Sequence, residues 1–497
     1  MKRLAQILVI ALLPLLGWTF AARAENEYPL ISTDLYLQML YVKQENFRVE
    51  NGIFGSSYAE AGGNFNSQLD QEAYRNLFES CFRLGTTLSF ADHIKGRFAI
   101  EINPRDAREQ GFGDGAADLG VSRTSVLRLK NYYLEAEHAV GGFLGYRVGR
   151  QNFDTPRALV VGNADAEGLA LWYRGAEVGQ FLLAGALLDA RNTRELEDLY
   201  SHFIYQFPPS GGFTGSLYLS SLLYRDRTSG EYNLPPEISL GGGSDIGKWL
   251  IGVDPVDPSN ASMSRGQLYW AGVELGYTDS GFVLGIDAVM NFGNLDPGFR
   301  SEANIDTVQS SMAMLDTNYG RGFWRVGAAG AYVSGHDPDP SANRYTGFLD
   351  INANFGFTRF FFDGGPYMVA QGFASPAVQG SGLFGGKVYT EMTPLDWLSI
   401  NLQVAGLSAQ YDRPQLANNE DGAVYNSVAD NAGSYYGTEA DFWLEFRPAK
   451  QLHWLTEVDY FQPGNYFKGT AVDKKNPTGF LESPDPAWRI SGGFLFY

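Results

Sequence analysis

The sequence predicts an all-β fold, a transmembrane antiparallel β-barrel of about eighteen strands with short turns at one end and long loops at the other. Short segments of alternating apolar and polar residues recur along the chain. The connections between these segments alternate between short and long, and the chain finishes in an aromatic, strand-like run, AWRISGGFLFY, at residues 487–497. These three observations together favour a closed barrel over a soluble sandwich, which has no reason to alternate the lengths of its connections.

The first 24 residues have the pattern of a secretory signal peptide. Lys2 and Arg3 precede an apolar stretch from Ile7 to Phe20, and residues 22–24 form a small-x-small cleavage site. The apolar stretch is short for a bilayer span of about 20 residues, which disfavours an N-terminal anchor. We therefore expect cleavage before Glu25 and a single barrel domain over residues 25–497.

Composition excludes some partners and cofactors. The net charge of −19 argues against nucleic acid, because nothing would offset the phosphate charge. The single cysteine, Cys81, cannot form an internal disulfide, and no pair of histidines has metal-ligand spacing. The sequence therefore predicts no cofactor and no bound metal.

Four segments show the alternation most clearly. They are FRLGTTLSF (82–90), RFAIEI (97–102), FVLGIDAVMNF (282–292) and DFWLEFR (441–447). In each segment one face carries Phe, Leu or Ile and the other carries charged or small residues. Such period-two patterns predict strands with one apolar face and one polar face.

The connections predict the topology. Eight are short, whereas nine are long, near residues 44–80, 104–125, 153–167, 189–199, 226–264, 293–305, 334–384, 409–436 and 463–486. Barrels of the bacterial outer membrane have short periplasmic turns, long external loops and an even number of strands. We therefore expect the protein in the outer membrane, in contact with lipid and lipopolysaccharide.

The last segment is expected to close the barrel. A strand at residues 487–497 must pair with a first strand near Leu35–Tyr41, so that no backbone edge faces lipid. Trp488, Ile490, Phe494 and Phe496 would then face the bilayer.

One stretch does not fit simple alternation. Residues 344–373 lie inside an expected external loop but contain two apolar runs. An extra hairpin would raise the strand count to twenty, and a loop folded into the lumen would leave sixteen or eighteen. We favour the folded loop, because barrels of this size enclose an aqueous lumen that loops narrow.

Three segments resemble the alginate-export family of outer-membrane barrels. They are YRVGRQNF (146–153), AYVSGHDPDP (331–340) and GTEADFWLEFRPAKQLHWLTEVDYFQPGNYFKG (437–469). The resemblance implies a channel of about eighteen strands for passive passage of solutes, in some members an anionic exopolysaccharide. It departs at His336, where the family pattern leads us to expect an acidic residue.

Alternation also assigns candidates that line the pore. They are Arg83, Arg97, Glu101, Arg147, Arg150, Arg174, Glu274, Asp287, Arg325, Glu439, Asp441, Glu445 and Arg447, with Glu457 and Asp459 as further acidic positions. Arginines on early strands facing acids on late strands would set up a transverse field that filters solutes by charge. Alternatively, these charges pair across neighbouring strands and stabilise the wall.

Catalysis has little support in the sequence. No nucleophile elbow, zinc-binding helix motif or phosphate-binding loop is present. Of the five histidines, His202 and His336 are the two near the external side, where a barrel enzyme would place one. We predict that the protein is not an enzyme.

The function that follows is a channel for passive passage of hydrophilic solutes, resembling exopolysaccharide exporters. An exporter would have arginines dominating its narrowest part and a periplasmic partner. A general small-solute porin would have mixed charge and no partner. A third alternative is a plugged barrel that acts as a surface-binding or adhesion protein through its loops.

Overall fold

The computed structural model describes sixteen stretches of the chain. They are residues 29–45, 74–103, 126–140, 143–161, 165–175, 177–187, 199–224, 266–295, 307–335, 344–349, 356–359, 382–411, 433–467, 472–473, 476–480 and 486–496. The expected signal peptide, residues 1–24, and the terminal Tyr497 lie outside them.

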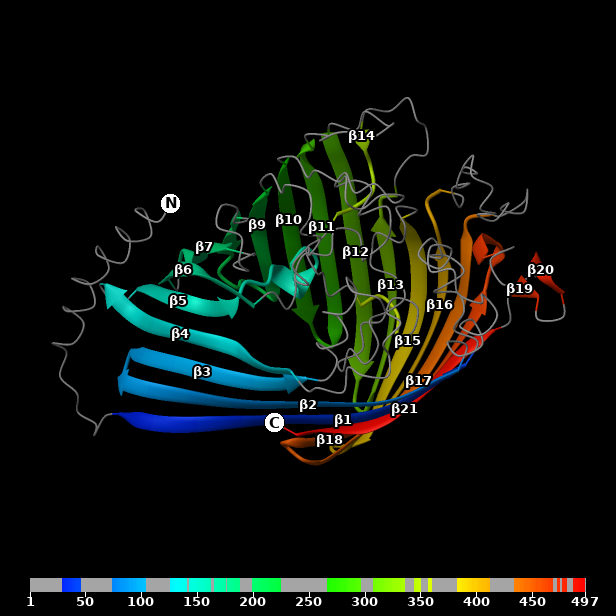
Figure 1. Ribbon diagram of the computed structural model, residues 1–497, viewed down its shortest axis with the longest axis horizontal. Coiled ribbons are helices and arrows are strands. Elements are labelled where there is room, and N and C mark those ends of the chain that lie inside the picture. Colours follow the sequence, from blue (N-terminus) through cyan, green and yellow to red (C-terminus); the bar gives the residue numbers. More distant parts are fainter. Residues whose placement is uncertain are drawn as a thin grey trace.

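Eighteen antiparallel strands form one closed ring (Figure 1). They are β1 (Leu30–Glu45), β2 (Tyr74–Ala91), β3 (Ile94–Asn103), β4 (Val126–Val140), β5 (Leu144–Asn152), β6 (Asp165–Gly175), β7 (Gly179–Leu187), β8 (Leu199–Gln206), β9 (Phe213–Tyr224), β10 (Gly266–Asp279), β11 (Phe282–Leu295), β12 (Thr307–Arg321), β13 (Trp324–Val333), β15 (Leu383–Leu395), β16 (Leu398–Ser408), β17 (Tyr435–Ala449), β18 (Leu452–Pro463) and β21 (Ala487–Phe496). The predicted fold class is confirmed.

The ring closes where the sequence predicted. Residues Leu37 to Glu45 of β1 pair with Trp488 to Phe496 of β21, and β21 pairs with β18 on its other side. Figure 1 shows the red β21 beside the blue β1. Ile490 and Phe496 are 41% and 37% exposed on the outward face, as predicted. A closed ring leaves no unpaired strand edge, which a bilayer would not tolerate.

The alternation of connections is also confirmed. Short turns join β2 to β3, β4 to β5, β6 to β7, β8 to β9, β10 to β11, β12 to β13, β15 to β16 and β17 to β18. The other nine connections are longer and all lie at the opposite end of the barrel. Strand β2 begins at Tyr74, so the first long connection is shorter than the expected 44–80.

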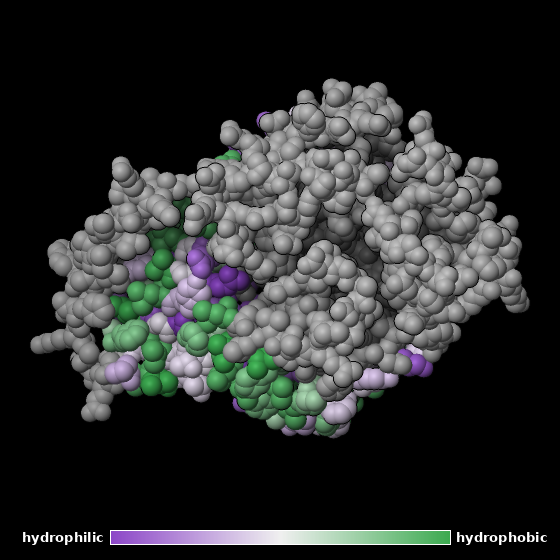
Figure 2. Space-filling model, in the orientation of Figure 1, coloured by the Kyte–Doolittle hydropathy of each residue, from purple (hydrophilic) through white to green (hydrophobic). Residues whose placement is uncertain are grey.

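The two faces of the wall differ in chemistry. Outward positions carry exposed apolar side chains from all around the ring, among them Phe98, Leu183, Leu219, Met290 and Val388. Where Figure 2 shows described residues, hydrophobic ones crowd the surface around β1 to β5. Lumen-facing positions carry charged and polar groups. An apolar outer face on a closed barrel places the protein in the outer membrane. No helix in the described residues is long and apolar enough to span a bilayer.

The elements outside the ring are short. β14 (Arg344–Tyr345) runs parallel to the loop end of β12 and adds no hairpin to the barrel. β19 (Val472–Asp473) and β20 (Asn476–Phe480) form a separate pair. Two helical turns, η3 (Pro156–Ala158) and η6 (Asn465–Phe467), follow the loop ends of β5 and β18. The count is therefore eighteen, and the alternative of an extra hairpin at 344–373 is wrong.

Candidate functional site: the lumen of the barrel

The arginines of the early strands point into the lumen and contact carboxylates on adjacent strands. The pairs are Arg83–Glu101, Arg97–Asp34, Arg147–Glu135 and Arg174–Glu137. Arg97 donates to both oxygens of Asp34, at 2.8 and 2.9 Å. The loosest pair is Arg174–Glu137, whose closest atoms are 4.0 Å apart. These arginines therefore carry their own counter-charges.

Arg150 is on the other face of the wall. Its cross-strand partners are Tyr132 and Glu167, and Tyr132 lies opposite the outward-facing Phe98. Residues three apart on a strand point to opposite faces, so Arg147 and Arg150 cannot both line the lumen. The assignment of Arg150 to the pore is therefore corrected to the outward face, near the loop end.

The connection between β5 and β6 folds into the lumen and carries an arginine across it. Arg157, within η3, donates to Asp287 at 2.7 Å and to Glu274 at 3.2 Å. These carboxylates belong to β11 and β10, and β7, β8 and β9 lie between them and β6 in the ring. The two predicted acidic candidates thus meet a cation that comes from a loop.

Residues 153–161, which we call the first inward segment, have an apolar seat. Phe153, Leu159, Val160 and Val161 are buried in one cluster with lumen-facing aromatic residues of β8, β9 and β10. The hydroxyl of Thr155 accepts hydrogen bonds from the backbone N–H groups of Val160 and Val161, closing the segment on itself. This packing holds η3 inside the barrel.

The connection between β13 and β15 also folds inward. Its described residues, 344–349 and 356–359, form the second inward segment. Phe348, Leu349 and Phe357 are buried in the same apolar cluster as the first segment. The indole N–H of Trp270 on β10 donates to the carbonyl of Leu349 at 2.7 Å. The expectation of a loop folded into the lumen is confirmed for these residues.

Arg359 fixes the far end of the second segment. Its guanidinium contacts Glu457 and lies 4.4 Å from the centre of the Trp443 ring. Its backbone N–H donates to Glu439 at 3.0 Å, and its carbonyl accepts from Arg489. The second segment therefore reaches from β10 on one side of the lumen to β17, β18 and β21 on the other.

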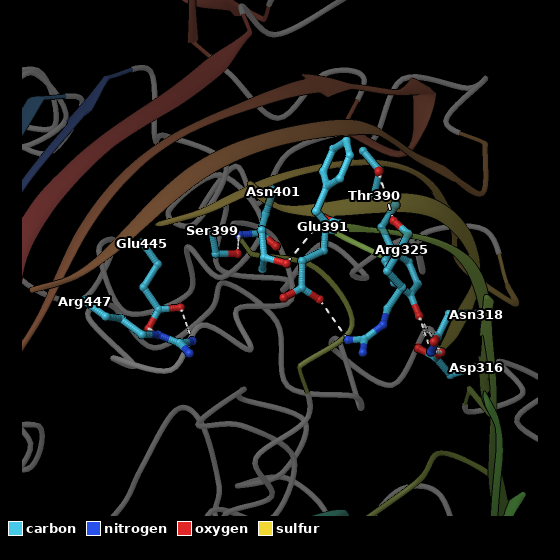
Figure 3. A network of polar contacts seen from close by, with 12 residues as sticks. Asp316, Asn318, Arg325, Thr390, Glu391, Ser399, Asn401, Glu445 and Arg447 are labelled. Carbon is cyan, nitrogen blue, oxygen red and sulfur yellow. Dashed lines mark hydrogen bonds and ion pairs between the residues drawn. The ribbon is translucent and has the colours of Figure 1, made fainter. Parts of the chain in front are cut away.

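A third set of polar contacts lies nearer the turn end, on β12 to β18 (Figure 3). Arg325 donates to Glu391 at 2.9 Å, and Arg447 donates to Glu445 at 2.8 and 2.9 Å. The hydroxyl of Tyr389 donates to Asp316 at 2.6 Å. Arg325 and Arg447 are half exposed, so these pairs face water in the lumen.

The expected separation of basic and acidic walls is not what the structure has. Early arginines pair with Asp34, Glu101 and Glu135, and late acids pair with arginines of their own or of the inward segments. Charges on neighbouring strands are closer than charges across the lumen, so local attraction dominates. The described residues contain no group of three potential ligands arranged for a metal ion.

Alternation could not identify Arg157 and Arg359, because both lie in connections. Arg359 had a signal, since it belongs to the apolar stretch 344–373 that did not suit an external loop. Arg157 had none beyond its position directly after Pro156. Of the two histidines singled out, His202 is buried beside the Tyr200 hydroxyl, and His336 lies outside the described residues.

The closed ring, the apolar outer face and the charged lumen define a class. The chain is an outer-membrane β-barrel of the channel type and not an enzyme.

No protein-family model and no curated protein matches the chain. Three similar solved structures come from Pseudomonas aeruginosa. OccK5 (OpdH) is 9% identical, with 94% of this chain and 98% of that chain covered and a TM-score of 0.49. The outer membrane protein OprD is 12% identical, with 96% and 95% covered and a TM-score of 0.49. The outer membrane protein OpdK is 10% identical, with 95% and 99% covered and a TM-score of 0.48.

The resemblance to the alginate-export family is wrong, because the solved structures similar to this chain are OprD and Occ proteins. The segments that suggested it are strands running into loops and one hairpin, at residues 146–153, 331–340 and 437–469. Every large barrel has such features, so they do not separate one family from another.

Proposed function

We propose that the protein lets small hydrophilic solutes cross the outer membrane passively through its lumen. The observation that carries this proposal is the lining. An eighteen-stranded wall is wide enough for an aqueous channel, and its inward charges are of both signs and paired. This is what a general small-solute porin needs, and arginines do not dominate the described lumen as a polyanion exporter would require.

The two inward segments set what can pass. Arg157 is 41% exposed and lies beside Glu274 and Asp287, so a solute near η3 meets both signs of charge within a few ångströms. Paired charges at a narrowing favour hydrated, polar solutes over apolar ones. We place the narrowest part of the path at η3.

Planar-bilayer recording of the purified barrel, with the reversal potential measured in a salt gradient, tests the proposal. We expect discrete conductance steps. Arg157→Gln should shift the reversal potential toward cation selectivity, because Glu274 and Asp287 lose their counter-charge. Arg150→Gln is the matched control, since the same charge is removed from the outward face, and selectivity should stay unchanged.

Two outcomes would contradict the proposal. No steps in any preparation would favour a plugged barrel whose loops bind at the surface. Equal shifts from Arg157→Gln and Arg150→Gln would show that the lining near η3 does not control passage. Swelling of liposomes in sugars of increasing size would then fix the size limit of any open path.

A further inference from the structure

Four carboxylates are buried together behind the second inward segment. Glu439 and Asp441 lie on β17, and Glu457 and Asp459 lie on β18, where Asp441 and Asp459 are direct cross-strand partners. Each of the four residues is at most 3% exposed. Burying ionised carboxylates is costly unless each has a counter-charge or hydrogen-bond donors.

Fewer cations than carboxylates face the cluster. Arg489 on β21 donates to Glu457 at 2.6 Å and to Asp459 at 2.7 Å, and Arg359 contacts Glu457. The surrounding side chains with a charge or a polar head are Lys387 (β15), Gln403 (β16), Glu439 (β17), Glu457 and Asp459 (β18), Arg489 (β21) and Arg359 (second inward segment). Three cations face four acids, so one negative charge is uncompensated among these described groups.

The excess charge is on β17. Asp459 and Glu457 contact guanidinium groups, whereas Asp441 accepts only from the amide of Gln403, at 2.5 Å through Oδ2. The other oxygen of Asp441, Oδ1, is buried and has no hydrogen-bond donor. The Asp441 and Glu439 side chains lie within hydrogen-bonding reach of each other on the same strand. Two ionised carboxylates cannot hydrogen-bond, so this contact needs a proton.

We propose that Asp441 and Glu439 share one proton at neutral pH, and that this proton keeps the second inward segment in place. The proton turns a repulsive contact into a hydrogen bond and neutralises the excess charge. It leaves Glu439 Oε1 as an acceptor for the backbone N–H of Arg359, at 3.0 Å. The acid pair is thus one of the ties between the wall and residues 356–359.

Losing the proton would loosen this tie. Above the pH at which the pair ionises, two buried anions lie within hydrogen-bonding reach, and water must enter to solvate them. The segment that covers the carboxylates, Phe357 to Arg359, would have to lift. The direction is therefore release at alkaline pH and docking at neutral and acidic pH.

Infrared difference spectroscopy of the whole barrel, in light and heavy water, tests the proton directly. The wild-type protein should show the carbonyl stretch of a buried protonated carboxyl at neutral pH and lose it on alkaline titration. Asp441→Asn and Glu439→Gln should each lack the band yet fold, because either amide can donate to the remaining carboxylate. A band that survives in both variants, or variants that fail to assemble, would overturn the proposal.

Channel recording tests the consequence. Conductance of the wild-type barrel should rise on alkaline titration, and Asp441→Asn should abolish that rise. Glu445→Gln is the matched control, because Glu445 is on the same face of β17 but pairs with Arg447, and its variant should keep the rise. A rise that persists in Asp441→Asn would overturn the link between the acid pair and the segment.

A bound cation is the competing occupant. If stability at neutral pH depended on sodium, potassium or calcium and the infrared band were absent, the charge would be supplied by a metal ion and the proposal would fall. The infrared measurement does not need an open channel, so failure of the proposed function leaves it decisive.

Discussion

The two inward segments each place one arginine against carboxylates of the wall, but in different surroundings. The Arg157 side chain is 41% exposed and its partner Glu274 is 31% exposed. The Arg359 side chain is 10% exposed, its partner Glu457 is 4% exposed, and an aromatic ring lies beneath it. The same pair of residue types therefore has two physical roles in one lumen.

Exposure decides which role each arginine has. An ion pair in water contributes about 0–1 kcal/mol, because solvent screens the attraction. Removing one partner of a buried pair costs about 3–5 kcal/mol, because the other charge stays behind without compensation. The Arg157 contact is thus open to ions and solutes, whereas the Arg359 contact fastens a loop to four strands.

The largest effect should come from Arg489→Gln. Arg489 is 3% exposed and supplies charge to Glu457 and Asp459 and a donor to the carbonyl of Arg359. We expect the free energy of unfolding in detergent to fall by about 3–5 kcal/mol. Arg447→Gln is the control, because it breaks an exposed pair with Glu445 and should cost about 0–1 kcal/mol. Equal losses would mean that burial does not separate the two kinds of pair.

The sequence predicted the wall well, for a physical reason. A strand between lipid and water must alternate, so the pattern around Asp287 or Asp441 fixes which side chains face inward. The closing strand was predictable because a barrel cannot leave an edge in the bilayer. Arg150 was misplaced because charge was considered without the parity that puts it opposite Arg147.

The inside of the lumen was less predictable. Arg157 and Arg359 lie in connections, where no repeating pattern links sequence to direction. Their partners lie 117, 130 and 98 residues away, so only the folded barrel brings them together. The pairing of charges across strands was open in the sequence because it depends on register, which alternation alone does not give.

A medium effect is expected at the other end of the second inward segment. Trp270→Phe removes the donor to the Leu349 carbonyl and leaves a buried acceptor without a partner. The loss should be about 1–3 kcal/mol in unfolding experiments. Trp397→Phe, at a 43% exposed indole in a turn, is the matched control and should change stability little. If Trp397→Phe cost as much as Trp270→Phe, the tie at Leu349 would contribute nothing.

The smallest effect has the opposite sign and concerns the first inward segment. Arg157 and Ala158 have φ angles of 51° and 54°, a left-handed conformation that costs an ordinary residue about 1–2 kcal/mol. Ala158→Gly should relieve part of that cost, and the greater freedom of glycine in the unfolded chain should leave a net gain of about 0.5–1 kcal/mol.

The matched control for this gain is Ala166→Gly in β6. Ala166 is buried in a regular strand, where glycine brings no relief and should cost about 0.5–1 kcal/mol. Chemical denaturation of both variants in detergent measures the two signs. A loss in Ala158→Gly would mean that the turn at η3 is not strained. A gain would show that the contacts of Arg157 and the apolar seat outweigh an unfavourable backbone, which is why this exposed segment stays inside the barrel.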